Sequence, residues 1–417
     1  MQNDLTESVQ ASIRPGEMAD MYYYGESNLA KQAYPTVVNT RFVQNFTNLG
    51  AGSSQFVISP NGGVSDIVCQ FTTAAGTYTL LALNQGWGYS LINRLSVRYG
   101  SSAQYFFTGP QMYLQNLIDA ENSQKSVDLT TLGGAALAGS ACAGATGYVY
   151  LKLPHNSIRA NGKPLPFPSD LLVQPIVITV ELLALNSILI NQGGSLAGAP
   201  SALASAQMQV KQEMLTDSSD QLARRVDMNS HAYTCPLMYF AQQEVQVQVA
   251  SSAGSLNVST NLTGFRAGEV QRIVLWLTPS GAVQTPGSGS FNPLQWLAMN
   301  NLILTYNGEI FARYDAGSAQ LWNLAGDEKS QSVSTSVQTV GSVAVTPTVM
   351  TWIDAPFAQT NMAYDREMKL VHGKPILNAV VNVSFDVPAL NTSYILHAMY
   401  LYNASLLCSR GSAEYIF

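Results

Sequence analysis

The stretch INRLSVRYGSSAQYFFTGPQMYLQNL, residues 92–117, returns in altered form as MNNLILTYNGEIFARYDAGSAQLWNL, residues 299–324. The two segments align without a gap at a constant offset, which the leucines give as 302 − 95 = 207 residues. The matching pairs are Asn93 and Asn300, Leu95 and Leu302, Tyr99 and Tyr306, Phe107 and Tyr314, Leu114 and Leu321, Asn116 and Asn323, and Leu117 and Leu324. A repeat spaced by half of a 417-residue chain predicts two related domains in tandem.

The repeated unit has the pattern of two strands joined by a turn and followed by a short helix. The turn falls at residues 100–101 in the first copy and at residues 307–308 in the second. The helix is expected over residues 110–123, and its counterpart over residues 317–328. Because a pair of strands cannot bury its apolar face alone, we expect each copy to lie inside a β-sandwich of its own.

Short apolar runs, alternating or rich in β-branched residues, dominate the rest of the sequence. Residues 245–249, VQVQV, alternate with period two, as a strand does when one of its faces is buried. The expected strands are residues 36–46, 65–71, 91–99, 147–153, 175–183 and 206–215, and then 244–250, 269–277, 301–307, 348–353, 376–385 and 394–407. Gly, Pro and Asn separate these runs, so the chain is predicted to be all-β and to form two sandwiches.

The boundary between the two domains is expected in a polar segment of mixed charge, residues 216–234, which has no strand alternation. The first domain then covers residues 36–215 and the second covers residues 235–417. Residues 1–35 are expected to form an N-terminal arm outside both domains.

Two low-complexity segments follow the repeated units at matching places, residues 129–147 and 329–347. Both are predicted to be long surface loops on one common face. A shorter echo pairs GKPL at residues 162–165 with GKPI at residues 373–376, at an offset of 373 − 162 = 211 residues. Four residues are weaker grounds for an equivalence than the long repeat.

The composition points to surfaces that meet other protein surfaces. Charged residues make up 11% of the chain, against about 25% in ordinary soluble domains. The chain also has 20 tyrosines, a residue that is enriched at interfaces between proteins. A secreted Ser/Thr-rich β protein would have a similar composition. The net charge of −6 and the lack of any basic run argue against a protein that coats nucleic acid.

No motif for catalysis, cofactor binding or metal binding is found. The four histidines lack the spacing of metal ligands, and the sequence has neither a GxSxG elbow nor a GxxxxGK[ST] phosphate loop. The cysteines have no CxxC pair and are expected to be buried free thiols: Cys69, Cys142, Cys235 and Cys408. We therefore expect no catalytic, cofactor-binding or metal-binding residue.

The remaining charged and aromatic candidates also have structural interpretations. The candidates are Asp217, Asp220, Arg224, Arg225, Asp327, Glu328, Trp276, Trp322 and Trp352. The carboxylates are expected to be solvated loop charges rather than an acid–base pair, and the arginines to form ion pairs at the domain boundary. The tryptophans are expected to be core or interface anchors rather than platforms for sugars.

No targeting or membrane segment is expected. Residues 1–18 lack the basic and apolar regions of a signal peptide. The most apolar run, residues 171–190, is interrupted by Gln174, Pro175 and Glu181, which a membrane span would not carry. These observations predict a soluble protein made in the cytosol.

Three stretches resemble the double jelly-roll major capsid proteins of the lineage that joins tailless phages to adenoviruses, virophages and large eukaryotic DNA viruses. They are residues 92–117, LPFPSDLLVQPIVITVELL at residues 165–183, and NNLILTYNGEIF at residues 300–311. The large eukaryotic-virus members tend to carry a charged turn where this chain has Gly-Ser-Ser at residues 100–102. Small phages, virophages and other small icosahedral viruses therefore all remain open as the virus group.

The resemblance implies two tandem eight-stranded jelly-roll β-sandwiches with short helices and long surface loops. It also implies a major capsid protein of an icosahedral double-stranded DNA virus, a homotrimer that imitates a hexagon and tiles the shell of the virion. Its partners would be neighbouring capsomers, penton and minor capsid proteins and, where the virus has one, an internal membrane. Enzymatic activity, cofactors and sequence-specific nucleic acid binding are not implied.

Three alternatives differ in what they require. A β-sandwich surface adhesin or carbohydrate-binding protein calls for a signal peptide, and a cupin-type enzyme calls for a clustered His/Glu metal set. A penton or spike protein of the same kind of virus usually has one sandwich and a long appendage, whereas this sequence has two similar halves.

Overall fold

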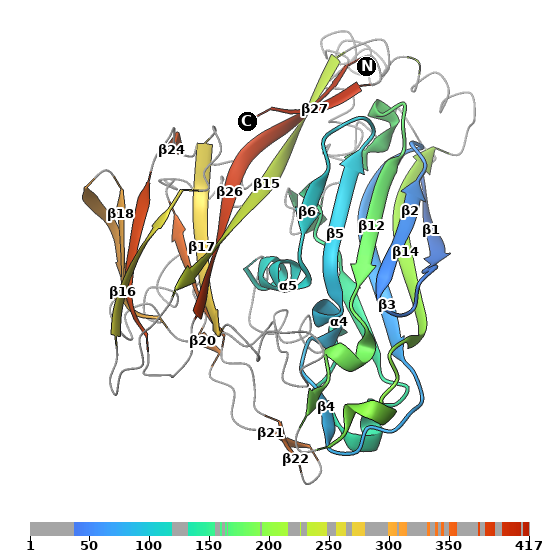
Figure 1. The fold of residues 1–417 in the computed structure, drawn as a ribbon. Coiled ribbons are helices and arrows are strands. Elements are labelled where there is room, and N and C mark those ends of the chain that lie inside the picture. The colour runs from blue at the N-terminus through green and yellow to red at the C-terminus, as the bar shows by residue number, and fades with distance from the viewer. Residues whose placement is uncertain are drawn as a thin grey trace, which may run out of the picture.

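The structure is a computed structural model in which antiparallel sheets make up most of the described residues (Figure 1). The described residues are 37–118, 132–154, 159–160, 163–164, 166–191, 194–215, 226, 232–247, 256–263, 269–279, 299–306, 308–314, 332–333, 338–340, 343–345, 350–356, 374–375, 380–387, 394–409 and 412–416. The predicted arm at residues 1–35 and nearly all of the predicted linker at residues 216–234 lie outside them.

The first half of the chain forms two sheets that face each other. One has the order β1-β14-β3, with β8 and the short β11 both pairing with β3; the other has the order β2-β12-β5-β6. The strands are β1 (Val37–Asn45), β2 (Gly52–Ile58), β3 (Gly63–Thr73), β5 (Ile92–Tyr99), β6 (Tyr105–Phe107), β8 (Thr146–Tyr150), β11 (Phe167–Pro168), β12 (Ile176–Leu182) and β14 (Leu203–Leu215).

The second half forms two sheets of the same kind. One has the order β15-β26-β17-β23 and the other the order β16-β25-β18-β19. The strands are β15 (Ala232–Val247), β16 (Leu256–Leu262), β17 (Glu269–Pro279), β18 (Asn300–Tyr306), β19 (Glu309–Tyr314), β23 (Met350–Pro356), β25 (Val381–Val387) and β26 (Tyr394–Ser409).

The two halves share one strand order. When the eight principal strands of each half are numbered along the chain, both halves give sheets of order 1-8-3-6 and 2-7-4-5. This is the order of a jelly roll, in which the chain passes back and forth between two facing sheets. The predicted all-β fold of two tandem eight-stranded jelly rolls is therefore confirmed.

Short elements complete the two jelly rolls. The helices are α4 (Trp87–Ser90) and α5 (Gly109–Ile118), and 3-10 turns lie at Gly139–Cys142, Ser169–Leu171, Leu185–Ser187 and Leu196–Gly198. The short strands are β4 (Leu81–Leu83), β7 (Leu137–Ala138), β9 (Arg159–Ala160), β10 (Lys163–Pro164), β13 (Ile190–Asn191), β20 (Ser332–Val333), β21 (Gln338–Val340), β22 (Val343–Val345), β24 (Lys374–Pro375) and β27 (Ser412–Ile416).

The sequence repeat is also a structural repeat. Its two copies form β5 with β6 and β18 with β19, which are the fourth and fifth strands of their jelly rolls. The helix predicted over residues 110–123 is α5, which is described as far as Ile118. Its predicted counterpart over residues 317–328 lies outside the described residues.

Each copy also contains a β-bulge near the start of its fourth strand. In β5 the bulge is at Asn93, whose Nδ2 donates a 2.9 Å hydrogen bond to Oε1 of Glu181 on β12. In β18 the bulge includes Asn301, which has a φ of +50° and donates from Nδ2 to Oδ2 of Asp386 on β25 at 2.6 Å. In both halves, an asparagine at the bulge is thus tied to a carboxylate of the neighbouring strand.

The shorter echo, at an offset of 211, does not mark equivalent positions. Lys163–Pro164 pairs with β9, whereas Lys374–Pro375 pairs with β17, the third strand of the second jelly roll. In the first jelly roll it is Phe167–Pro168 that pairs with the third strand. Pro168 and Pro375 then correspond at an offset of 375 − 168 = 207, which is the offset of the long repeat.

The third and eighth strands pair in the same register in both halves. Ser65 is bulged out of the pairing between β3 and β14, and Gln271 is bulged out of the pairing between β17 and β26. Counting from these bulges, Val68 corresponds to Val274, Gln70 to Trp276, Gln209 to Met399 and Gln207 to His397. Positions on the two sheets can therefore be compared one by one.

Alternating burial fills the core of each jelly roll. In β12, every second residue from Ile176 to Leu182 is buried, as the period of a strand requires. Phe46 packs edge-on against Phe56 and Phe71, with ring centroids 4.7 and 5.5 Å apart. All four cysteines are free and buried, which confirms the expectation from their spacing.

Some strands extend beyond the sequence pattern or were not predicted. The strand expected over residues 244–250 begins at Ala232, inside the predicted linker, and pairs with β26 along its whole length. Its first half contains Pro236 and alternates in burial, with Ala232 and Thr234 exposed and Tyr233, Cys235 and Leu237 buried. The linker prediction missed this short alternation. The second strands, β2 and β16, were not among the predicted strands.

The small residues predicted to form a loop at 129–147 partly form packed structure. They include β7 and a 3-10 turn, and the backbone N–H of Gly88 donates to the carbonyl of Gly133 at 2.9 Å. A side chain on Gly134, where φ is +121°, would collide with the indole of Trp87. Glycine is needed here because the backbone packs closely against the indole. A glycine-rich composition is compatible with either a flexible loop or close packing, so the sequence alone does not distinguish them. The segment 329–347 contains β20, β21 and β22.

We predict that Gly134→Ala destabilises the protein more than Gly144→Ala does. Both glycines have positive φ, +121° and +70°, but a side chain at Gly144 meets nothing within 4 Å. Gly144→Ala should cost about 1 kcal/mol for the backbone, whereas Gly134→Ala should cost about 1–3 kcal/mol more because it crowds the indole. Urea unfolding of both variants measures the difference, and equal midpoints would contradict the packing role of Gly134.

Candidate functional site

The described residues offer little for catalysis. No group of three or more His, Cys, Asp or Glu side chains among them is placed to hold a metal ion. Burial raises the pKa of the Cys142 thiol to about 11 and that of Cys408 to about 12, so both thiols stay protonated near neutral pH. No helix in the described part of the chain is long and apolar enough to cross a bilayer.

Most of the charged and aromatic candidates from the sequence cannot be placed. Seven lie outside the described residues: Asp217, Asp220, Arg224, Arg225, Asp327, Glu328 and Trp322. Trp352 lies on β23 and pairs with Trp276 on β17. Trp276 itself is 3% exposed, as expected for a core or interface anchor.

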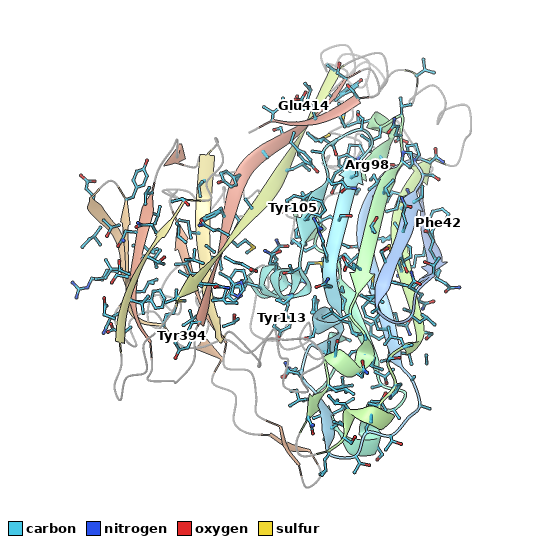
Figure 2. All side chains as sticks on the ribbon, in the orientation of Figure 1. Phe42, Arg98, Tyr105, Tyr113, Tyr394 and Glu414 are labelled. Atoms are coloured by element: carbon cyan, nitrogen blue, oxygen red, sulfur yellow. The ribbon has the colours of Figure 1, made fainter. Side chains whose placement is uncertain are left out.

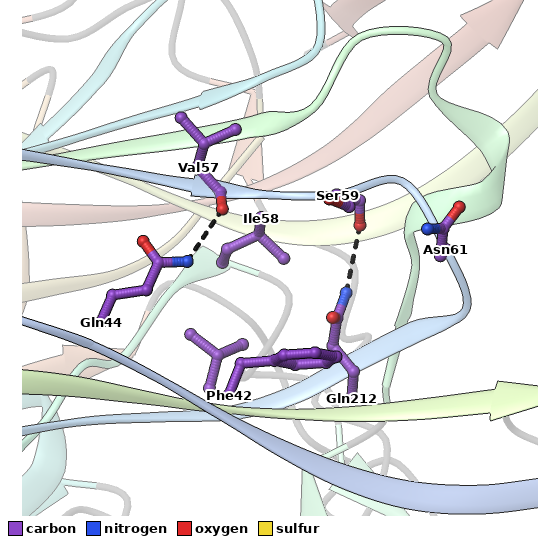
Figure 3. A pocket seen from close by; sticks show the side chains of 8 residues that line it. Phe42, Gln44, Val57, Ile58, Ser59, Asn61 and Gln212 are labelled. Atoms are coloured by element: carbon purple, nitrogen blue, oxygen red, sulfur yellow. Dashed lines mark hydrogen bonds between the residues drawn. The ribbon is translucent and has the colours of Figure 1, made fainter.

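A small pocket opens in the first jelly roll between the edge strands β1 and β2 (Figure 3). Its volume is about 250 Å³, and its lining residues are Phe42, Gln44, Val57, Ile58, Ser59, Asn61, Val210 and Gln212. Gln44 Nε2 donates to the carbonyl of Val57 at 3.0 Å, and Gln212 Nε2 donates to the carbonyl of Ser59 at 3.1 Å. The two amides thus bridge the facing sheets. None of the lining residues is titratable, so the pocket has no group for acid–base chemistry.

The two jelly rolls also contact each other. Helix α5 of the first jelly roll lies between β6 and the long strands β15 and β26 of the second (Figure 1). The amide of Gln115 is buried there, and its Nε2 lies 3.7 Å from Sδ of Met399 on β26. Figure 2 shows Tyr113 of the same helix on this side of the first jelly roll. A helix that follows the repeated strands therefore covers part of the other jelly roll.

The C-terminal strand makes a second contact between the halves. β27 pairs with β26, and the backbone N–H of Ala413 donates a 2.8 Å hydrogen bond to Oγ of Ser101. Ser101 belongs to the turn between β5 and β6. The Gly-Ser-Ser turn at residues 100–102 thus contacts β27.

A polar row crosses the outer face of the second jelly roll beside α5. Nδ1 of His397 lies 3.3 Å from Oε1 of Glu244, and its Nε2 lies 2.8 Å from Oγ1 of Thr278. The Trp276 ring stacks on the imidazole at a centroid distance of 5.0 Å and an angle of 4°. The hydrogen bond from His397 lowers the pKa of the Glu244 carboxyl below its ordinary value. The row therefore links three strands by polar contacts.

These contact residues do not stand out as a group in the sequence. Gln115 belongs to the predicted helix and Ser101 to the predicted turn, but nothing in the local pattern assigns them partners on β26 and β27. His397 was considered for metal binding alone. Its partner Glu244 is 397 − 244 = 153 residues away in the chain, so their contact depends on strand pairing.

We predict that Glu244→Gln destabilises the protein more at pH 7 than at pH 3. Because the folded-state pKa of Glu244 is lowered, its stabilisation is present above the unfolded pKa of about 4.3 and is lost as pH falls through the folded value. The loss at pH 7 should be about 0.5–1 kcal/mol, since the carboxylate is 57% exposed and solvent weakens the interaction. Urea unfolding at both pH values measures it, with the exposed Glu309→Gln as control. An equal loss at both pH values would contradict a stabilising role of the Glu244 carboxylate.

Comparison with known proteins finds similarity in structure but not in sequence. No protein-family model matches the chain, and no curated protein matches its sequence. Several solved viral structures align over most of it, of which three are described. VP54 of PBCV-1 aligns with a TM-score of 0.61 and 14% identity, over 92% of this chain and 97% of the other.

The other two structures give the same picture. A chain of the Sputnik virophage aligns with a TM-score of 0.57 and 12% identity, over 92% of this chain and 89% of the other. The Faustovirus major capsid protein aligns with a TM-score of 0.52 and 12% identity, over 98% of this chain and 99% of the other. Identities this low establish the fold alone. Together with the shared strand order of its two halves, they show that this chain has the double jelly-roll fold of these viral structures.

Proposed function

We propose that the chain is a major capsid protein of an icosahedral double-stranded DNA virus. The observation that carries the proposal is the presence of two jelly rolls of one strand order and register in a single chain. The alignment with the Faustovirus major capsid protein over 98% of this chain supports it. In this role the chain is a structural subunit of the virion shell and has no catalytic function.

The duplication has a geometric use in such a shell. Three copies of a chain with two similar jelly rolls present six similar walls, so that a homotrimer can fill a six-fold position in a lattice. Closed rings are the common outcome of repeated head-to-tail contacts. Neighbouring capsomers, penton and minor capsid proteins would then contact the outside of the trimer.

The composition supports extensive contact between copies. A monomer with 11% charged residues has little surface charge to prevent non-specific self-association. Burying its side surfaces against neighbouring copies removes that exposed surface. Permanent interfaces of this kind commonly bury more than about 2,000 Å². Folding and association should therefore be linked.

We predict an obligate homotrimer in solution. Light scattering of the purified protein at micromolar concentration should give three times the chain mass of 44.8 kDa. Where unfolding is reversible, the melting temperature should rise with protein concentration, because the trimer dissociates as it unfolds. A folded monomer of 44.8 kDa would contradict the proposal and would favour a surface adhesin instead.

A further inference from the structure

The eighth strands of the two jelly rolls carry different side chains at one equivalent buried position. Val210 on β14 pairs with Ile67, and Tyr400 on β26 pairs with Ile273. Because Ile67 and Ile273 are equivalent in the register that both halves share, Val210 and Tyr400 are equivalent too. Both are buried, at 1% and 0% exposed. One half therefore holds an aromatic ring in its core where the other half holds a small aliphatic side chain.

A glutamine on the first strand is shared by the two halves. Gln44 on β1 and Gln243 on β15 pair with equivalent positions of the eighth strands. In each half its side-chain amide bonds to the backbone at the second strand. Nε2 of Gln44 donates to the carbonyl of Val57 at 3.0 Å, and Oε1 of Gln243 accepts from the N–H of Thr263, directly after β16, at 3.0 Å. The same residue thus links the two facing sheets in both jelly rolls.

In the second jelly roll, the tyrosine ring reaches this glutamine. Oη of Tyr400 donates a 2.9 Å hydrogen bond to Oε1 of Gln243. Burial raises the pKa of the Tyr400 hydroxyl above its ordinary value, so the hydroxyl stays protonated and can donate. A buried phenol ring is therefore held there by apolar packing and by one hydrogen bond to an amide.

In the first jelly roll, Val210 and Gln44 instead line the pocket of about 250 Å³. Figure 3 shows Gln44 and Gln212 at the two sides of this pocket, with Ile58 between them. Phe42, which pairs with Val210, does not fill the space, since it lies at the pocket wall and is 42% exposed. An apolar cavity of about 150 Å³ can hold a benzene ring, so the pocket is large enough for a phenol.

We propose that this pocket binds the phenol ring of a tyrosine side chain, held as Tyr400 is held in the second jelly roll. The ring would pack on Val210 and Ile58, and its hydroxyl would donate to Oε1 of Gln44. Nε2 of Gln44 would keep its hydrogen bond to the carbonyl of Val57. The proposal does not depend on the proposed trimer, because it rests on the equivalence of the two halves within one chain.

The chemistry of the pocket fits this ligand. None of the lining residues is charged, and the polar side chains among them are the amides of Gln44, Gln212 and Asn61 and the hydroxyl of Ser59. Such a lining favours a neutral ring with one hydroxyl over an ionic ligand.

One source of such a ring is the chain itself, which has tyrosines at positions 22, 23 and 24. Tyr24 precedes Val37, the first residue of β1, by 37 − 24 = 13 residues. An extended segment of this length spans up to about 45 Å, which exceeds the distance along β1 from Val37 to Gln44. A tyrosine of another protein would supply the same group.

The test uses 4-methylphenol, which is the tyrosine side chain without its backbone. Methyl NMR spectra of the full-length protein are recorded as 4-methylphenol is added to about 1–10 mM, the range expected for a ligand of so few atoms. The methyl signals of Val210 and Ile58 should shift, because both residues line the pocket. Those of Ile273 should not, because its partner Tyr400 already fills the equivalent place.

A second titration separates the two sources of the ring. It uses the variant Tyr22→Ala/Tyr23→Ala/Tyr24→Ala. Shifts in the unmodified protein mean that the pocket is open to a tyrosine of another protein, and shifts in the variant alone mean that the chain's own tyrosines fill it. Both results support the proposal. No shift in either protein, or an equal shift at Ile273, overturns it.

Two further measurements identify the binding mode in the protein that binds. Val210→Tyr should abolish the shift at Ile58, whereas Val43→Tyr, on the opposite face of β1, should not; circular dichroism verifies that both variants are folded. A folded Val210→Tyr that still binds overturns the proposal. Should Val210→Tyr not fold, 4-methylanisole, which has no hydroxyl donor, serves instead. It should require a several-fold higher concentration than 4-methylphenol, and an equal requirement overturns the proposed hydrogen bond to Gln44.

Discussion

The second jelly roll depends on a helix that belongs to the first. Strand β26 has buried side chains on both of its faces, and a sheet of this kind needs cover on each side. The facing sheet of its own jelly roll covers one side, and α5 with Gln115 covers Met399 on the other. The two halves therefore pack against each other through this face.

The chain has few charged residues, and its exposed sheet faces instead carry side chains that are linked by hydrogen bonds. On the outer side of β16 and β25, Asn382 Nδ2 donates to Oγ of Ser259 at 3.1 Å and to Oδ1 of Asn261 at 3.0 Å. Asn257 Nδ2 donates to Oδ1 of Asp386 at 2.8 Å, which helps to lower the pKa of that carboxyl. Such side chains satisfy one another across strands, so that the sheet remains polar without carrying many charges.

The sequence predicted those parts of the fold that depend on local pattern. The repeat of residues 92–117 located the fourth and fifth strands of both jelly rolls, because the alternation, the turn and the helix start are all local signals. The packing of Gly134 on Trp87 and the contact of Gln115 with Met399 depend on contacts between distant segments. The sequence match between Lys163–Pro164 and Lys374–Pro375 is misleading for the same reason. Only the pairing with β3 shows that Phe167–Pro168 is the structural counterpart of Lys374–Pro375.

We propose that the duplicated jelly roll lets three copies of one chain form six similar walls. Electron microscopy of the purified assembly tests it most directly, through class averages viewed along the symmetry axis. We expect a closed particle with three-fold symmetry and six lobes of nearly equal size, two from each chain. Averages that show isolated two-lobed particles, or a ring with a number of lobes other than six, would contradict it.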